Sequence, residues 1–187
     1  MRVISGTARG RRLHEPSGRG VRPTADRVKE AMFNIIQLRV ENRRVLDLFS
    51  GTGQLGIEAL SRGARGAVFV DASPESVRLT RENVELSGVS GLEAVVRRDS
   101  IAYLGEGCGR FGLIFLDPPF DTALLRESLD KIMKFDILEE NGIIVCESRS
   151  DAPAPDARDP YYIASGHKYG GTKLTLYSRM AMHTQED

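Results

Sequence analysis

The sequence predicts an α/β protein built on a doubly wound, mainly parallel β-sheet with helices on both faces. The first observation is a regular alternation along the chain, in which short apolar runs are followed by segments with helical periodicity. This alternation is the pattern of consecutive βαβ units, which form parallel sheets covered on both sides. The second observation is size and composition, because 187 residues with 41% hydrophobic and 28% charged side chains suit one compact domain.

The elements of the N-terminal half follow from apolar runs and helix-start signals. Thr24 is a good N-cap for a helix with an apolar face at helical spacing, and Pro74 suits the first turn of another helix. In order, the expected elements are a hairpin or extended arm (2–13), a helix (24–38), a strand (44–49), a helix (54–62), a strand (66–70) and a helix (74–86).

The C-terminal half continues this rhythm and closes with a hairpin. The proline-rich segment 150–160 is expected to be a surface connection, and Gly170-Gly171 is a turn signal between two strand-like runs. The last eight or so residues are expected to fray. The expected elements are strands at 92–96, 111–116 and 142–146, a helix at 122–134, and hairpin strands at 161–165 and 173–177.

Charge and cysteine content restrict the class of protein and its compartment. The chain has 26 basic and 26 acidic residues, so any basic surface must come from local clustering. Its two cysteines, Cys108 and Cys146, show neither a disulfide framework nor metal-ligand spacing. No secretory signal and no run of 18 apolar residues is visible. We therefore expect a monomeric cytoplasmic protein with no membrane attachment and no metal.

Basic residues do cluster at the N-terminus, where residues 1–30 carry eight basic and three acidic side chains. Arginines interleaved with glycines favour a flexible, sequence-tolerant contact with nucleic-acid phosphates. A solvated charge run is the alternative interpretation. The expected substrate-binding residues in this region are Arg9, Arg11, Arg12, Arg22, Thr24 and Arg27.

The tetrapeptide Asp117-Pro118-Pro119-Phe120 is the most informative segment, and it follows the apolar run 111–116. Ligands of open α/β sheets bind beyond the carboxyl ends of the strands, which is where this turn falls. Two prolines have no N–H to donate and their rings restrict the backbone, so the turn presents acceptors with few competing donors. Such a turn suits the exocyclic amino group of a flat base, with the Phe120 ring stacked on its face.

A glycine-rich turn follows the first predicted core strand. Gly51, Gly53 and Gly56 match the spacing G-x-G-x-x-G, and Asp71 stands at the tip of the next predicted strand, where dinucleotide-binding proteins carry an acidic residue. Asp47 lies just before this turn and would repel a pyrophosphate, whereas a cofactor with an amino group and a sulfonium would be attracted.

S-adenosylmethionine (SAM) is that cofactor, and successive strand ends supply its expected contacts. The glycines permit close approach of its methionine part, Asp71 would accept hydrogen bonds from the ribose hydroxyls, and Asp99-Ser100 would meet the adenine edge. Helix capping or solvated turns are the alternative roles of these carboxylates. The expected cofactor-binding residues are Asp47, Ser50, Gly51, Thr52, Gly53, Asp71, Asp99 and Ser100.

The glycine-rich turn paired with the Asp117–Phe120 turn resembles class I SAM-dependent methyltransferases that act on nucleobase amino groups. The run from Arg22 to Asn34 (RPTADRVKEAMFN) is similar to the signature of the RsmD family of 16S ribosomal RNA guanine-N2 methyltransferases. The arm at 6–12 and the hairpin at 168–173 are also similar, so the resemblance covers about residues 1–178. Thr52 and Gln54 stand where many members have serine and alanine.

The resemblance implies a Rossmann-like sheet of seven strands with the last strand antiparallel, plus a small basic N-terminal extension. It implies a basic RNA-contacting arm (1–22), a methyltransferase domain (23–178) and a frayed tail (179–187). The implied partner is 16S ribosomal RNA or an assembling small ribosomal subunit. The implied reaction is methyl transfer to N2 of a guanine flipped into the Asp117–Phe120 site.

The expected catalytic residues are Asp117, Pro118 and Phe120, with Pro119 beside the substrate. The Asp117 carboxylate and the Pro118 carbonyl would accept the two N–H bonds of the amine, which aims its lone pair at the SAM methyl. Three alternatives remain: a DNA adenine-N6 methyltransferase, a noncatalytic RNA-binding assembly factor, and an NAD oxidoreductase.

Overall fold

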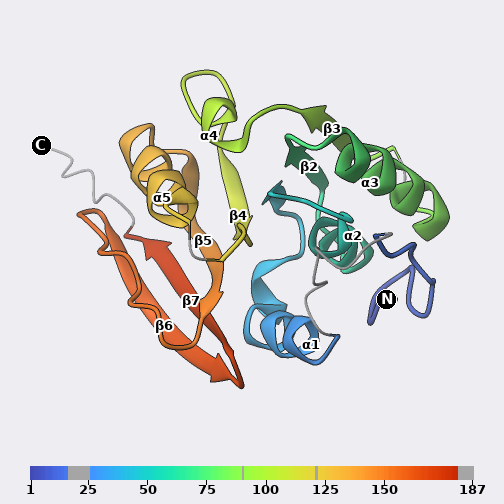
Figure 1. The fold of residues 1–187 in the computed structure, drawn as a ribbon, viewed down its shortest axis with the longest axis horizontal. Helices are drawn as coiled ribbons and strands as arrows, with labels where there is room; N and C mark the ends of the chain where they lie inside the picture. The colour runs from blue at the N-terminus through green and yellow to red at the C-terminus, as the bar shows by residue number, and fades with distance from the viewer. Residues whose placement is uncertain (17–25, 90, 121, 181–187) are drawn as a thin grey trace, which may run out of the picture.

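The computed structural model describes residues 1–16, 26–89, 91–120 and 122–180. Within them, seven strands form one sheet in the order β3-β2-β1-β4-β5-β7-β6, and β7 alone runs opposite to the other six strands (Figure 1). The strands are β1 (Arg44–Leu48), β2 (Gly66–Asp71), β3 (Glu93–Arg97), β4 (Phe111–Leu116), β5 (Leu138–Arg149), β6 (Tyr161–Tyr169) and β7 (Thr172–Arg179).

The order of the parallel strands reverses between β1 and β4. Strand β1 pairs with β2 on one side and with β4 on the other, with Leu48 opposite both Val70 and Leu116. Every residue of β4 is buried, as expected for a central parallel strand covered on both faces. The reversal opens a crevice beyond the carboxyl ends of these strands, which is the general ligand site of such sheets.

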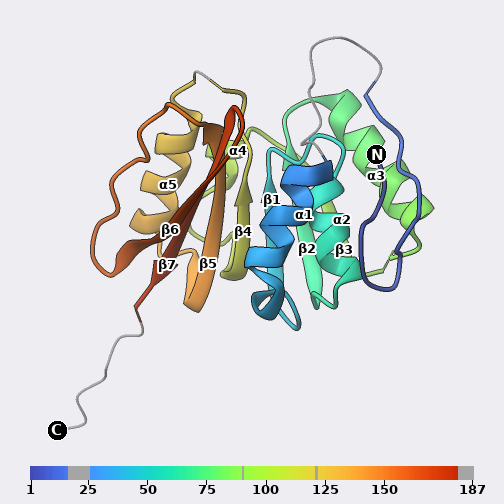
Figure 2. The ribbon, with the colours of Figure 1, turned by 90° about the horizontal axis from the view of Figure 1, so that it is seen from below.

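Helices cover both faces of the sheet and bury two separate apolar clusters (Figures 1 and 2). Met32, Phe33 and Ile57 belong to the first cluster, whereas Leu129 and Ile132 belong to the second. The helices are α1 (Asp26–Ile35), α2 (Gln54–Ser61), α3 (Pro74–Ser87), α4 (Ser100–Tyr103) and α5 (Leu124–Lys134). None of the helices in the described ranges has the length and apolar character that spanning a membrane requires.

The predicted elements recur, with differences at their ends. Strand β5 begins at Leu138, whereas the sequence predicted a strand beginning at residue 142. Glu139, Glu140 and Asn141 interrupt the apolar pattern, so the pattern revealed only the part of the strand that follows them. The helix expected at 24–38 ends at Ile35 and continues as a 3₁₀ turn over Gln37–Arg39, and its expected N-cap lies outside the described residues. Helix α4 was not predicted.

Two expectations about the chain ends need correction. Arg179 was assigned to a frayed tail, but it is the last residue of β7 and is 3% exposed. Its guanidinium pairs with Asp136 (Nε to Oδ1, 2.9 Å). Residues 181–187 lie outside the described part. The N-terminal arm is not flexible between Met1 and His14, because Val3, Ala8 and Leu13 are buried in the core.

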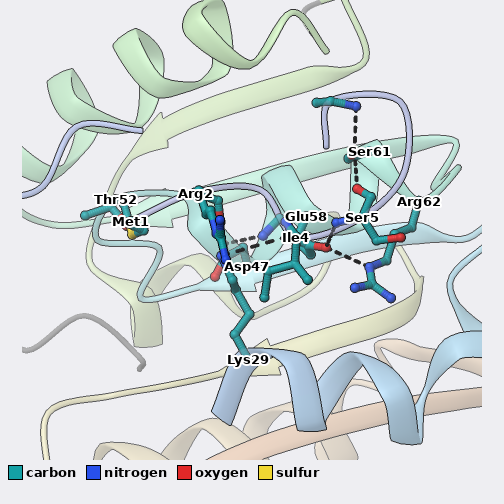
Figure 3. Close-up of polar contacts among 12 residues, drawn as sticks. Met1, Arg2, Ile4, Ser5, Lys29, Asp47, Thr52, Glu58, Ser61 and Arg62 are labelled. Atoms are coloured by element: carbon teal, nitrogen blue, oxygen red, sulfur yellow. Dashed lines mark hydrogen bonds and ion pairs between the residues drawn. The ribbon is translucent and has the colours of Figure 1, made fainter. Parts of the chain in front are cut away.

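The arm is held by polar groups of α2 and α1 (Figure 3). The Glu58 carboxylate accepts the backbone N–H groups of Ile4 (2.8 Å) and Ser5 (3.0 Å), and the Lys29 ammonium donates to the Arg2 carbonyl (2.7 Å). Glu58 and Lys29 are both fully buried. Their charges therefore depend on such protein partners to compensate for lost hydration.

Candidate active site

A cleft of about 1050 Å³ opens at the carboxyl edge of the sheet. Its walls come from the turn after β1, the end of β2, the turn after β3, the Asp117–Phe120 turn after β4, and Glu147 of β5. The start of α1 and the β6–β7 turn complete it. The strand reversal thus gathers segments that lie far apart in the sequence.

The Asp71 carboxylate fixes the backbone of the glycine-rich turn. Asp71 accepts the Gly51 N–H through Oδ2 (2.9 Å) and the Ser73 N–H through Oδ1 (2.8 Å). Gly53 has φ +75°, and a Cβ on it would lie 2.9 Å from the Thr80 methyl. A carboxylate oxygen can accept more than one hydrogen bond, so Asp71 retains acceptor capacity toward the cleft.

Asn83 of α3 connects the N-terminal arm to the same turn. Its Oδ1 accepts the His14 N–H (2.7 Å), while its Nδ2 donates to the carbonyls of His14 (3.1 Å) and Thr52 (2.9 Å). Asn83 is fully buried, so these bonds satisfy an otherwise costly amide.

Asp47 lies beneath the turn and is 2% exposed. Burial raises the pKa of its carboxyl to about 8, with smaller contributions from the negative charges of Asp117 and Asp71, and a hydrogen bond from Gly56 opposes the rise. That bond runs from the Gly56 N–H to Asp47 Oδ2 over 2.9 Å. Asp47 therefore holds the first turn of α2 from behind the cleft, and its raised pKa disfavours the negative charge that was expected to attract the cofactor.

The third predicted cofactor carboxylate is at the start of α4. Asp99 caps this helix by accepting the Ala102 N–H at Oδ1 (2.8 Å), and Ser100 beside it is 5% exposed. Both residues line the cleft, so the capping role foreseen as an alternative coexists with a position beside it.

The Asp117–Phe120 turn forms the opposite wall. Asp117 is half-buried and Pro118 is buried, while Phe120 is 38% exposed. The Thr122 hydroxyl donates to the Pro119 carbonyl (2.8 Å) and braces the turn. An exposed ring next to two acceptors provides a flat surface on which a base can stack.

The predicted site residues divide into three groups. Those lining the cleft are Arg27, Gly51, Asp71, Asp99, Ser100, Asp117, Pro118, Pro119 and Phe120. Those outside the lining form two subsets. Asp47, Ser50, Thr52 and Gly53 lie in or just before the glycine-rich turn, and Arg9, Arg11 and Arg12 are exposed on the arm. Arg22 and Thr24 lie outside the described residues.

Of the cleft residues that the sequence analysis did not name as site residues, Phe49 and Glu147 are the most informative. Phe49 has φ +72°, which a non-glycine residue rarely adopts, and its neighbour Ser50 shares with it the Val70 carbonyl as hydrogen-bond acceptor (3.0 Å each). Glu147 follows the apolar run 142–146 just as Asp117 follows the run 111–116, and that parallel was available in the sequence.

Comparisons with known proteins agree with this geometry. Residues 1–178 match the family model described as Conserved hypothetical protein 95. The chain is 32% identical to Ribosomal RNA small subunit methyltransferase D of Escherichia coli, over 97% of this chain and 91% of that one. The chain belongs to the RsmD family.

Other relatives cover most of the chain as well. Identity is 37% to the Bacillus subtilis protein YlbH, over 96% of this chain and 99% of YlbH. The solved structure of the Thermus thermophilus protein TTHA0928 superposes with a TM-score of 0.81 at 32% identity, covering 94% of this chain and 98% of that one. The predicted family and the predicted Rossmann-like fold of an RsmD-type methyltransferase are thus confirmed.

Proposed function

We propose that this protein transfers the methyl group of SAM to the N2 amino group of a guanine in small-subunit ribosomal RNA. One observation carries the proposal: the glycine-rich turn after β1 and the Asp117–Phe120 turn after β4 face one cleft. A donor held by the first turn and an amine held by the second would meet across it. Relatives named as ribosomal RNA small subunit methyltransferases support the RNA substrate.

The charges around the cleft fit this cofactor. Four carboxylate residues line it, against only Arg27 and Lys168 among its basic residues in the described ranges. When bound, SAM supplies an electrophilic methyl group on a sulfonium, and its positive charges suit acidic walls, whereas the pyrophosphate of NAD would be repelled. The carboxylates are Asp71, Asp99, Asp117 and Glu147.

Two buried polar atoms at the glycine-rich turn have the chemistry to hold the methionine end of SAM, although neither residue lines the cleft. In the described part of the chain, Ser50 Oγ and Gln54 Oε1 are buried without a hydrogen-bond partner. A hydroxyl donates to carboxylates and an amide oxygen accepts from ammonium groups, so these atoms match an amino-acid moiety.

The catalytic work of the chain is positioning. The Asp117 carboxylate and the Pro118 carbonyl accept the two N–H bonds of guanine N2, which turns the nitrogen lone pair toward the methyl donor. Holding two reactants in this geometry can contribute about 7–11 kcal/mol to lowering a barrier. Asp117 can take up the proton after transfer, and no strong base is required because a protonated arylamine is acidic.

Phe120 and the arginines complete the substrate site. Stacking of a base on an aromatic ring is worth about 1–3 kcal/mol, which offsets part of the few kcal/mol needed to flip a nucleotide. Arg27 at the cleft and the exposed Arg9, Arg11 and Arg12 of the arm would contact RNA phosphates. We propose that the protein acts as a monomer on naked RNA or on an assembling small subunit.

The test offers isotopically labelled SAM to the protein with small-subunit particles that lack the modification, followed by digestion of the RNA and identification of the labelled nucleoside. Recovery of N2-methylguanosine supports the proposal. The Asp117→Ala variant should lose transfer while binding SAM with nearly unchanged affinity, and Asp130→Asn, an exposed carboxylate on α5, should behave as wild type.

Other results would redirect the assignment. Normal methylation by Asp117→Ala would remove the turn from the mechanism. N6-methyladenosine in duplex DNA would promote the DNA enzyme. Particle binding that is indifferent to SAM, without labelled product, would indicate a noncatalytic assembly factor.

A further inference from the structure

Glu147 lies beside Asp117 at the carboxyl edge of the sheet. Strands β4 and β5 pair in parallel register, with Leu116 opposite Cys146, so the next residue on each strand is a carboxylate. Neighbouring strands lie about 4.8 Å apart. The two carboxylates are therefore close enough to contact one small ligand together.

Both side chains leave the sheet on the same face. Side chains alternate along a strand, so Asp117 shares the face of Phe115 and Glu147 shares the face of Val145. Phe115 and Val145 belong to the same apolar cluster, the one that α1 and α2 cover. Glu147 is 7% exposed and lines the main cleft, so it is a buried part of the cleft wall.

Two adjacent carboxylates recognise a particular pattern of hydrogen-bond donors. An ionised carboxylate only accepts hydrogen bonds. Of the four RNA bases, guanine alone presents two neighbouring donor groups on its Watson–Crick edge, N1–H and the N2 amino group. Adenine and cytosine place an unprotonated ring nitrogen next to their amino group, and that lone pair would face a carboxylate with repulsion.

We propose that Glu147 is the residue that selects guanine, by accepting the N1–H of the base whose N2 amino group Asp117 holds. This inference rests on the function proposed above, because it assigns a second contact to the same base. Specificity then comes from attraction to one donor and from repulsion of the ring lone pair in competing bases. A site that hydrogen-bonds a substrate N–H discriminates strongly against analogues that lack it.

The experiment compares guanine with 2-aminopurine at the methylated position of ligated small-subunit RNA, for wild-type protein and the Glu147→Gln variant. 2-Aminopurine keeps the amino group at C2 but has no hydrogen on N1. The readout is the ratio of kcat/KM for guanine to that for 2-aminopurine, so the intrinsic reactivity of each base cancels between the two proteins. Glu127→Gln, an exposed position on α5, is the matched control.

We expect the wild-type ratio to favour guanine, and the Glu147→Gln ratio to fall about 5–150-fold, the range for one good base contact. The glutamine amide can donate to the unprotonated N1 of 2-aminopurine, so transfer to that base should rise relative to guanine. SAM affinity, measured by calorimetry, should stay unchanged in both variants.

The outcomes separate this inference from the function on which it rests. If wild-type protein makes no N2-methylguanosine, the proposed function fails first. If it does, but Glu147→Gln lowers transfer to both bases equally or leaves the ratio unchanged, Glu147 has only a structural role and the inference is overturned.

Discussion

Replacing Glu58 by glutamine tests how strongly the N-terminal arm is anchored. The Glu58 carboxylate accepts the N–H groups of Ile4 and Ser5 and a bond from Arg62 Nε (2.8 Å), and it lies 3.9 Å from the Lys29 ammonium. Glutamine has the same shape but no charge, and its NH₂ group would face one of these donors. The substitution therefore leaves a buried donor unsatisfied and a buried ammonium without its counter-ion.

The magnitude follows from burial. Glu58 and Lys29 are both 0% exposed, and removing one partner of a buried ion pair costs about 3–5 kcal/mol. Burial already lowers the pKa of Lys29, while Glu58 opposes that shift, so loss of Glu58 favours the neutral amine and limits the penalty. In a domain of this size each kcal/mol shifts Tm by about 2–4 °C, which gives an expected decrease of about 6–20 °C.

Urea unfolding followed by circular dichroism gives the free energy of unfolding, and limited proteolysis reports whether the arm has been released. Glu85→Gln, an exposed glutamate on α3, should change stability by less than about 0.5 kcal/mol. A loss below about 1 kcal/mol for Glu58→Gln, with the arm still protected, would refute the anchoring role.

Three further changes have defined outcomes. Gly56→Ala should cost about 1–3 kcal/mol in urea unfolding, because its Cβ would lie 2.3 Å from the Phe69 ring; an unchanged midpoint would contradict this close packing. The folded pKa of Asp47 is about 8 against about 3.9 in an unfolded chain, so its contribution to stability is fully present below about pH 4 and is lost as pH rises through about 8. Asp47→Asn should flatten this decline in unfolding measurements at pH 5 and 8.5, and an undiminished slope would assign the effect to other groups. Phe120→Ala should weaken RNA binding about 5–150-fold in filter-binding assays with SAM affinity unchanged, Phe120→Tyr should retain it, and equal losses in both would exclude stacking.

The central strands and the position of the cleft were predictable because their signals are local. Strand β4 is a continuous apolar run. Asp71 and Asp117 directly follow apolar runs and Asp99 comes shortly after one, so their meeting at one edge follows from parallel topology. The full length of β5 was hidden because polar residues at 139–141 interrupt its pattern.

The docking of the arm could not be predicted from the sequence, because it depends on long-range contacts of a few polar and apolar side chains. Glu58 lies in a mostly apolar helical segment, and nothing local shows that it binds the distant backbone of Ile4 and Ser5. Arginine-rich composition favoured a mobile arm, whereas three small or apolar side chains decide its position: Val3, Ala8 and Leu13.

The Asn83 amide makes the order of two distant segments interdependent. One planar group bonds the backbone at His14 and at Thr52, so a displacement of either segment strains the bonds of the other. A change in the position of the arm would therefore reach the loop after β1 through this one amide. Such coupling acts in both directions, because linkage between two sites is reciprocal.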